Sequence, residues 1–330
     1  MSIPDYIPLD LQRLTTDVPL DCDLYVKRGH RYLLYRASSS PVSFKITDAR
    51  RLVSSGVERL WIKFSEDDGA AQGRLASLLR LPDEQLPPRV KAQLWYGSAI
   101  ATAKRAIKTN APNSMLNDVQ GLIGLTVDYL VRSESALSAI LSSTVQDYST
   151  HSHAVNVAVY SLGIGSFNDA AGEQDLRNLG LAAFLHDVGK AKIPRQVLLK
   201  PGPLSPDEWK LMRQHPGFGQ EMLSSAPDLP AEVTEAVWQH HERLDGSGYP
   251  KGIGGSEMHH FAKVVSLADS FDAMTSSRPY ARPQSAFKAL SILKRECGAK
   301  YDSDLFINLV LLMGNPQRPE GVQVPAMAPT

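Results

Sequence analysis

The sequence is poor in cysteine, in net charge and in long apolar runs. Its 330 residues include two cysteines, Cys22 and Cys297, which are too far apart for a CxxC pattern; this argues against thiolate metal sites and suits a reducing compartment. Lys and Arg total 35, as do Asp and Glu, so the overall charge favours neither nucleic acid nor an anionic membrane as a partner. The apolar run LFINLVLLMG is too short to span a bilayer, and MSIPDYIPLDLQ lacks the basic and apolar parts of a signal peptide. We therefore expect a cytoplasmic protein.

Histidine is scarce at the start of the chain and concentrated later. Of nine histidines, only His30 precedes residue 150, and the other eight lie between His151 and His260. Surface histidines would be scattered along the whole chain. The concentration therefore favours a metal site in the second half.

Hydrophobic patterning predicts an α+β chain. DLYVK, RYLLYR, VSFKI and ERLWIKF have the composition of strands, and TDARRLVSSGV that of a helix capped by Thr47 or Asp48 and stopped by Gly56. We expect a small α/β regulatory or partner-binding domain over 1–82 and a helical connector over 83–142, after the proline-rich boundary LPDEQLPPRV. An all-α catalytic domain follows over 143–316, and a disordered tail over 317–330. The connector helices are equally compatible with the larger domain's own bundle.

Two adjacent pairs of metal-ligand residues stand out, His186-Asp187 and His240-His241. Neighbouring side chains on a helix point about 100° apart, so such pairs suit two metal ions side by side better than one. Two-metal sites commonly catalyse in-line displacement at phosphorus. A purely structural alternative is a buried ion pair between Asp187 and Lys190, at helical spacing on a helix that is apolar almost all round. A lone histidine on an apolar face, such as His240, is likewise often a packed core residue.

Three further residues lie in helical patterns and offer nitrogen or oxygen ligands. His153 opens the run HAVNVAVYSLGIG, and Asp269 lies among apolar residues in FAKVVSLADSFDAM. His215 ends the predicted helix GPLSPDEWKLMRQH, which Ser205 caps. With the two pairs they make seven nitrogen and oxygen donors, a set that suits Fe, Mn or Zn. The following DGSGYP is either a plain tight loop or one that directs Tyr249 and backbone amides at the site.

From about Asp147 to about Leu293, the chain resembles the HD-GYP domain, a branch of the HD phosphohydrolase superfamily. The resemblance rests on six blocks in the family's order: HSHAVNV, FLHDVGK, LLKPGPLSPDE, RQHPGFG, HHERLDGSGYP and SLADSFDAMTSSRPY. The resemblance implies an all-α HD-type catalytic domain that hydrolyses cyclic di-GMP to pGpG and, by further cleavage, GMP. It also implies two divalent ions, with Fe or Mn foremost and Zn, Ni or Mg as the other candidates.

The resemblance assigns roles to individual residues. Asp187 would bridge the two ions, and Lys190 would lie near the scissile phosphate. Substrate would contact Lys190, Gly248, Tyr249, Pro250 and Arg278. The metal ligands would be His153, His186, Asp187, His215, His240, His241 and Asp269.

The chain departs from the family pattern at two positions. Ser149 stands where some members carry a glutamate for a third ion, so we expect two ions. Ala281 replaces a second basic residue after Arg278, with Arg282 beside it. The histidines at 151, 259 and 260 match no ligand, and we expect Asp272 to be structural.

Two other functions remain open on the sequence alone. The domain could bind cyclic di-GMP and signal through a partner, such as a GGDEF-type cyclase, with little turnover. It could also be an HD hydrolase of another nucleotide. The sequence leaves a homodimer open and does not identify the input to residues 1–80.

Overall fold

The computed structural model describes residues 6–13, 23–37, 44–63, 71–108, 112–144, 149–168, 171–224, 226, 228–277 and 283–314. Arg278, Ala281, Arg282 and the predicted tail lie outside these ranges. The chain divides into two compact units, residues 1–101 and 102–330. The finer division into a domain, a connector and a catalytic domain stays a prediction.

A four-stranded antiparallel sheet forms the first part of the N-terminal unit, with the strand order β1-β4-β2-β3. Three of these four strands, β2, β3 and β4, were predicted, while β1 was missed because YIPLD contains Pro8. Proline interrupts a strand pattern and is tolerated at a sheet edge, where β1 lies. The predicted strand VSFKI is wrong at its end, since Ile46 already begins a helix. The strands are β1 (Tyr6–Asp10), β2 (Leu24–Arg28), β3 (Arg31–Arg36) and β4 (Arg59–Lys63).

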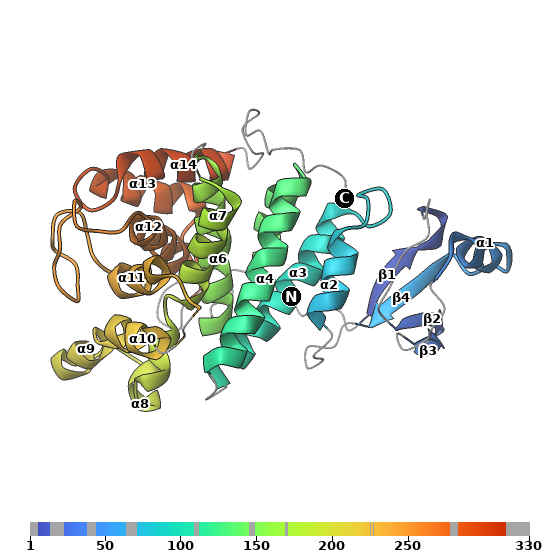
Figure 1. Cartoon of the computed structure of the whole chain (residues 1–330), viewed down its shortest axis with the longest axis horizontal. Coiled ribbons are helices and arrows are strands. Elements are labelled where there is room, and N and C mark those ends of the chain that lie inside the picture. The colour runs from blue at the N-terminus through green and yellow to red at the C-terminus, as the bar shows by residue number, and fades with distance from the viewer. Residues whose placement is uncertain are drawn as a thin grey trace. The chain divides into compact units, whose positions relative to one another are not determined.

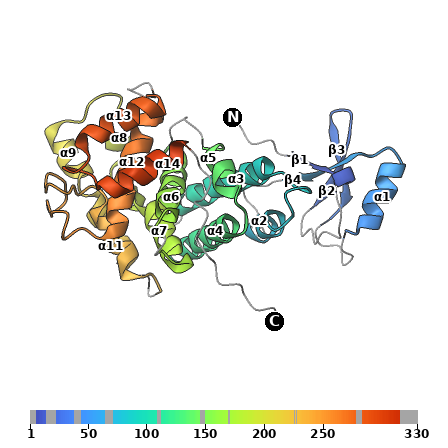
Figure 2. The ribbon, with the colours of Figure 1, turned by 90° about the horizontal axis from the view of Figure 1, so that it is seen from above.

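The helix α1 (Ile46–Ser54) packs with η1 (Leu11–Arg13) beside this sheet (Figure 2). The predicted N-cap, Thr47 or Asp48, is wrong: the helix begins earlier because the Asp48 carboxylate accepts a hydrogen bond from the Lys45 backbone N–H at 3.1 Å. Gly56, with φ of +88°, ends the helix as predicted. The core of the sheet is apolar and buried, and it includes Leu9, Leu24, Leu60 and Ile62.

The larger unit is helical. At its centre, α6, α7 and α12 are in mutual contact, with α4, α11 and α14 packed around them (Figure 1). The helix α6 is rich in Ala, Val, Gly and Ser, and every residue from Ser152 to Ser166 is buried. No helix in the described ranges is both long and apolar enough to cross a membrane. The remaining helices of the chain are α2 (Ala71–Leu79), α3 (Pro88–Lys108), α4 (Pro112–Arg132), α5 (Ala136–Leu141), α6 (Thr150–Ser166), α7 (Glu173–Leu185), η2 (Val188–Lys192), α8 (Arg195–Leu198), α9 (Pro206–Met212), α10 (His215–Ser224), α11 (Ala231–Gln239), α12 (His260–Thr275), α13 (Ala286–Glu296) and α14 (Ser303–Gly314).

Local signals fix where several of these helices begin. Ser205 caps α9 as predicted: its hydroxyl accepts from the Glu208 backbone N–H, and the Glu208 carboxylate accepts from the Ser205 N–H at 2.7 Å. Ser149 caps α6 in the same way, with its hydroxyl accepting from the Ser152 N–H at 3.0 Å. The cap explains what Ser149 does at this position, one turn before His153.

Candidate metal centre

The two adjacent pairs lie just beyond helix ends, and not on the helices as predicted. The helix α7 ends at Leu185, and Asp187 leads into the tighter η2. Similarly, α11 ends before His240. Because the chain leaves regular helical geometry here, the 100° spacing does not strictly apply.

His215 begins α10; the prediction that it ends the preceding helix is wrong. The helix α9 stops at Met212, and Pro216 occupies the second position of α10. Proline has no backbone N–H and its fixed φ suits the first turn of a new helix. The new helix places the buried His215 ring against the pair His240-His241, with ring centroids 5.2 and 5.0 Å away.

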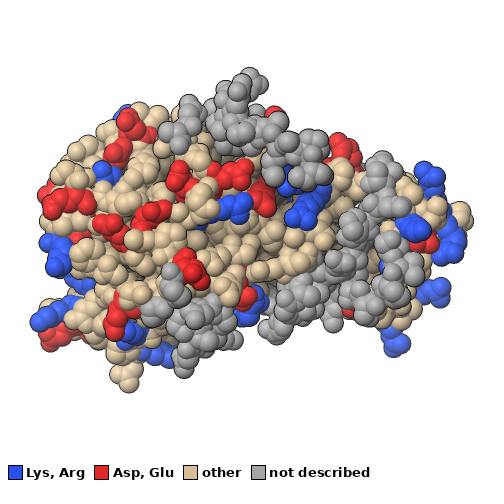
Figure 3. All heavy atoms as spheres, viewed as in Figure 1, with Lys and Arg blue, Asp and Glu red and all other residues tan. Residues whose placement is uncertain are grey.

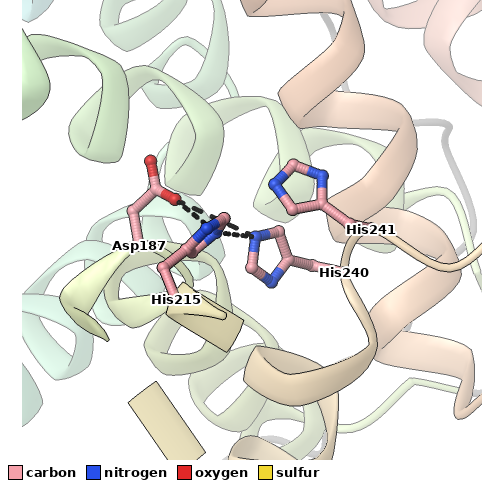
Figure 4. A group of neighbouring side chains, drawn as sticks. All are labelled: Asp187, His215, His240 and His241. Atoms are coloured by element: carbon pink, nitrogen blue, oxygen red, sulfur yellow. Dashed lines mark hydrogen bonds and ion pairs between the residues drawn. The ribbon is translucent and has the colours of Figure 1, made fainter. Parts of the chain in front are cut away.

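All seven predicted ligands come together, in two neighbouring groups of buried or half-buried side chains. Within each group the potential ligand atoms lie within 4.8 Å of one another. Figure 4 shows the larger group, in which the Asp187 carboxylate points toward the rings of His215 and His240. The groups are Asp187, His215, His240 and His241, and His153, His186 and Asp269.

Asp187 faces both groups at once. Its Oδ2 lies 3.3 Å from His186 Nε2 and 3.6 Å from His153 Nε2. Its Oδ1 lies 3.2 Å from His215 Nε2 and 3.9 Å from His240 Nε2. Oδ1 is buried and, among the described residues, has no hydrogen-bond partner of adequate geometry. A buried carboxylate oxygen needs a partner, and a cation would supply it.

The histidine tautomers also suit metal ions. In His186, His215 and His240, Nδ1 lies 2.6–2.8 Å from a backbone carbonyl three residues earlier. A carbonyl can only accept, so Nδ1 carries the proton and Nε2 presents a lone pair. The Nε2 atoms of His215 and His240 face each other at 3.2 Å, and those of His153 and His186 at 3.3 Å. Because two lone pairs repel, a cation beside each pair would satisfy the arrangement, and the residues present therefore fit a metal centre.

Electrostatics hold these groups in the protonation states that metal ligands need. Burial, reinforced by the neighbouring His241, keeps the pKa of His240 well below 6.5. Burial also lowers the pKa of His241, although the Asp269 carboxylate opposes it. Burial alone would raise the pKa of Asp187, but Lys190 and His186 outweigh it and hold that pKa well below 3.8. The metal-free site thus favours neutral rings at His240 and His241 and a charged carboxylate at Asp187.

Asp272 orients one of the ligands. Its Oδ2 accepts from His153 Nδ1 at 2.7 Å, and its Oδ1 accepts from Asn156 at 2.9 Å and from the Ser276 hydroxyl at 3.0 Å. This agrees with the structural role predicted for Asp272. A carboxylate behind a ligating histidine fixes the ring and its tautomer.

Replacing Asp272 with Asn should weaken metal binding roughly 10- to 100-fold, because His153 would lose the charged acceptor that fixes its ring. Titration of the metal-free protein with Mn²⁺ would measure the effect. Asp304→Asn, at an exposed acidic residue of α14, is the matched control. Equal affinity in the Asp272→Asn and control variants would contradict the positioning role.

Gly189 allows η2 to meet α10 backbone to backbone. A Cβ at this position would lie 2.0 Å from the His215 carbonyl oxygen and 2.4 Å from the Gly219 nitrogen. Neither atom can move aside without shifting the helix that carries His215. The glycine of the HDVGK block therefore serves the metal centre by permitting this approach.

Gly189→Ala should accordingly lower the free energy of unfolding by about 1–3 kcal/mol or more and reduce the metal content. Urea unfolding and elemental analysis would measure the two effects. In the control Gly217→Ala, on the same helix α10, a new Cβ would meet nothing within 4 Å. Equal free energies of unfolding for Gly189→Ala and Gly217→Ala would contradict the importance of the close backbone approach at Gly189.

The sequence profile of the HD domain family matches residues 130–305. The chain belongs to the HD domain family. It is 28% identical over 285 residues to cyclic di-GMP phosphodiesterase PA4108 of Pseudomonas aeruginosa, covering 81% of this chain and 67% of that protein. It is 40% identical over 152 residues to the cyclic di-GMP phosphodiesterase response regulator RpfG of Xanthomonas campestris pv. campestris, covering 46% of this chain and 38% of the relative.

A solved structure shares the fold. Bd1817, an HDG"Y"P protein from Bdellovibrio bacteriovorus, matches with a TM-score of 0.62 at 20% identity, covering 94% of this chain and 100% of that one. At this identity the likeness concerns the fold alone. It agrees with the predicted α+β layout, in which an HD domain follows a small sheet.

In this HD domain the loop after His241 is seated tightly against the ligand-bearing segment. A Cβ on Gly248 would lie 2.4 Å from Glu242 Cα and 2.5 Å from the His241 carbonyl oxygen. The buried Glu242 carboxylate accepts from the backbone N–H groups of Lys251 and Gly252 at 2.7 and 3.0 Å. Glu242 was missed by the sequence analysis, although an acid directly after two ligands was a usable signal.

The same loop places Tyr249 beside the ligands. Its ring stacks on His241, with centroids 4.6 Å apart and planes inclined by 30°. The guanidinium of the exposed Arg213 lies 4.7 Å from the Tyr249 ring centroid. No sequence pattern predicted this contact. Burial raises the pKa of the Tyr249 phenol far above its usual value, so the hydroxyl stays a hydrogen-bond donor. Tyr249 thus lies at the site as predicted, whereas Arg278 lies outside the described residues.

Proposed function

We propose that this HD domain is a two-metal phosphodiesterase that hydrolyses cyclic di-GMP to pGpG and, by further cleavage, GMP. The observation that carries the proposal is Asp187, whose two carboxylate oxygens each face one group of ligands. The names of the Pseudomonas and Xanthomonas relatives support the choice of substrate. The intact set of seven donors supports hydrolysis over binding without turnover.

Each group would hold one ion, with Asp187 shared between them. One ion would be held by His215, His240 and His241, and the other by His153, His186 and Asp269. We propose Fe or Mn as the resident metal, with Zn, Ni or Mg as the other candidates for this nitrogen and oxygen set. When bound, such ions supply Lewis acidity toward phosphoryl oxygens and acidify a coordinated water.

Lys190 would serve both the metal centre and the substrate. Its ammonium lies 2.5 Å from Asp187 Oδ2, and 22% of its side chain is exposed. It therefore keeps Asp187 charged and can also donate to a phosphoryl oxygen as negative charge develops there. Gly248, Tyr249 and Pro250, together with Arg278, would position the dinucleotide.

The test is an anaerobic assay of the purified chain with Mn²⁺ or Fe²⁺ and cyclic di-GMP, with the products separated by chromatography. We expect pGpG first and GMP later. A panel containing a mixed guanine–adenine cyclic dinucleotide and linear nucleotides would define selectivity. Absence of hydrolysis by metal-replete, folded protein would contradict the proposal, and tight binding without turnover would favour a signalling role through a partner such as a GGDEF-type cyclase.

A further inference from the structure

The N-terminal unit contains a cleft at the point where two neighbouring strands separate. Among the described residues, β2 and β4 pair only at Leu24 with Ile62 and at Tyr25 with Trp61. Beyond that point β2 runs on to Arg28 beside β3 alone. The opening is a depression open to solvent with a volume of about 410 Å³, within the range of small-molecule sites. All of its lining residues belong to the unit of residues 1–101.

The cleft is positively charged. Lys27 and Arg28 line it from β2 and Arg59 from β4, against one carboxylate, that of Glu58. Within the described part of the chain, no ion pair involves any of these three cations. The surrounding ranges 23–37 and 44–63 contain nine Lys and Arg residues against three Asp and Glu. Figure 3 shows Lys and Arg side chains gathered at the end of the view where the strands and α1 lie.

An aromatic wall adjoins these charges. The half-buried Trp61 lines the cleft, and the Lys27 ammonium lies 5.0 Å from its ring centroid. Trp61 also makes an edge contact with Tyr32, with centroids 5.2 Å apart, and Tyr32 stacks on Tyr6 at 3.8 Å. Trp61 is therefore part of a cluster of aromatic rings with Tyr32 and Tyr6. An aromatic surface held in this way can stack a planar ring.

We propose that this cleft binds a nucleoside phosphate, with the phosphate held by Lys27, Arg28 and Arg59 and the base against Trp61. The charge selects an anion, and guanidinium groups suit phosphate oxygens in particular. A bare anion would make no contact with the Trp61 ring, and a neutral aromatic compound would make no use of the positive charges of Lys27, Arg28 and Arg59. A volume of about 410 Å³ is large enough for a single nucleotide. Such a site would give the N-terminal unit a ligand of its own.

The test titrates the full-length, metal-replete chain with AMP, adenosine and inorganic phosphate while tryptophan fluorescence is recorded. Trp61→Phe isolates the signal of this residue from that of Trp95, Trp209 and Trp238. The double variant Lys27→Gln/Arg59→Gln removes two cations, and Arg50→Gln/Arg51→Gln on α1 removes two from the same unit away from the cleft. Circular dichroism verifies folding, and Arg28→Gln replaces the double variant if that variant is unstable.

AMP should produce a saturable change that disappears in Trp61→Phe. The Lys27→Gln/Arg59→Gln variant, adenosine alone and phosphate alone should each bind roughly tenfold more weakly, while the Arg50/Arg51 variant binds like the unmodified chain. Three results would overturn the proposal: no Trp61-dependent change with AMP, equal binding after loss of the two cations, or equal binding of phosphate and AMP.

Discussion

Asp187→Asn is expected to abolish hydrolysis and to leave the chain with fewer than two bound metal ions. The substitution keeps the shape of the side chain but replaces one carboxylate oxygen with an amide nitrogen, which cannot ligate as the oxygen does. Since Oδ1 and Oδ2 face different ligand groups, either orientation of the amide removes a ligand from one of them. Loss of one ion and of the bridging charge should lower kcat by roughly 10³-fold or more.

The measurement pairs a rate assay on cyclic di-GMP with elemental analysis of the same sample. Asp207→Asn, in the exposed first turn of α9, is a matched control that should keep both activity and metal content. The Asp187 variant must also unfold cooperatively, because the substitution removes the buried carboxylate that the Lys190 ammonium contacts. Full metal content in a folded Asp187→Asn protein would contradict the bridging role.

Acidification below about pH 6.5 should release the metal and destabilise the fold in the same pH window. The pKa values of His240 and His241 lie well below 6.5 in the folded chain, chiefly because the surroundings of the buried His240 and the half-buried His241 disfavour a charged ring. The unfolded chain therefore takes up protons on these rings at a higher pH than the folded chain does. Their stabilising contribution is complete above pH 6.5 and falls below it, by up to about 1.4 kcal/mol per pH unit for each histidine.

Metal binding should follow the same trend, because protons compete with metal for the same nitrogen atoms. Urea unfolding between pH 8 and pH 5, with and without Mn²⁺, would measure both effects. His241→Asn should reduce the slope of stability against pH, whereas His30→Asn, at an exposed position in the β2–β3 turn, should not. A free energy of unfolding that stays constant from pH 8 to pH 5 would contradict the burial argument.

The identity of the candidate ligands could be predicted because each lies in a short block with a recognisable residue pattern. The buried setting of Asp187 and Asp269 also followed from the apolar residues around them. The precise ends of the helices could not be predicted in this way. A predicted helix runs up to His215, and Pro216 is the only signal in the sequence that a new helix begins there. The exact boundary depends on how α10 meets η2 at Gly189, which is a tertiary contact.

Other features depend on partners far apart in the sequence. Asp272 orients His153 across 119 positions of the chain, and Arg213 meets Tyr249 only after the loop is seated. In the N-terminal unit, the cleft exists because β2 and β4 separate beyond the pair formed by Tyr25 and Trp61. Each strand by itself has an ordinary strand pattern. The composition of a segment predicts that it forms a strand, but the whole sheet determines which strands pair and where they separate.

The most direct test of the two-ion centre is a crystal structure of the Mn²⁺-loaded protein with anomalous scattering recorded at the manganese edge. We expect two anomalous peaks, one among His215, His240 and His241 and one among His153, His186 and Asp269, with the Asp187 carboxylate between them. A single peak, or peaks outside these two groups in fully loaded protein, would contradict the account.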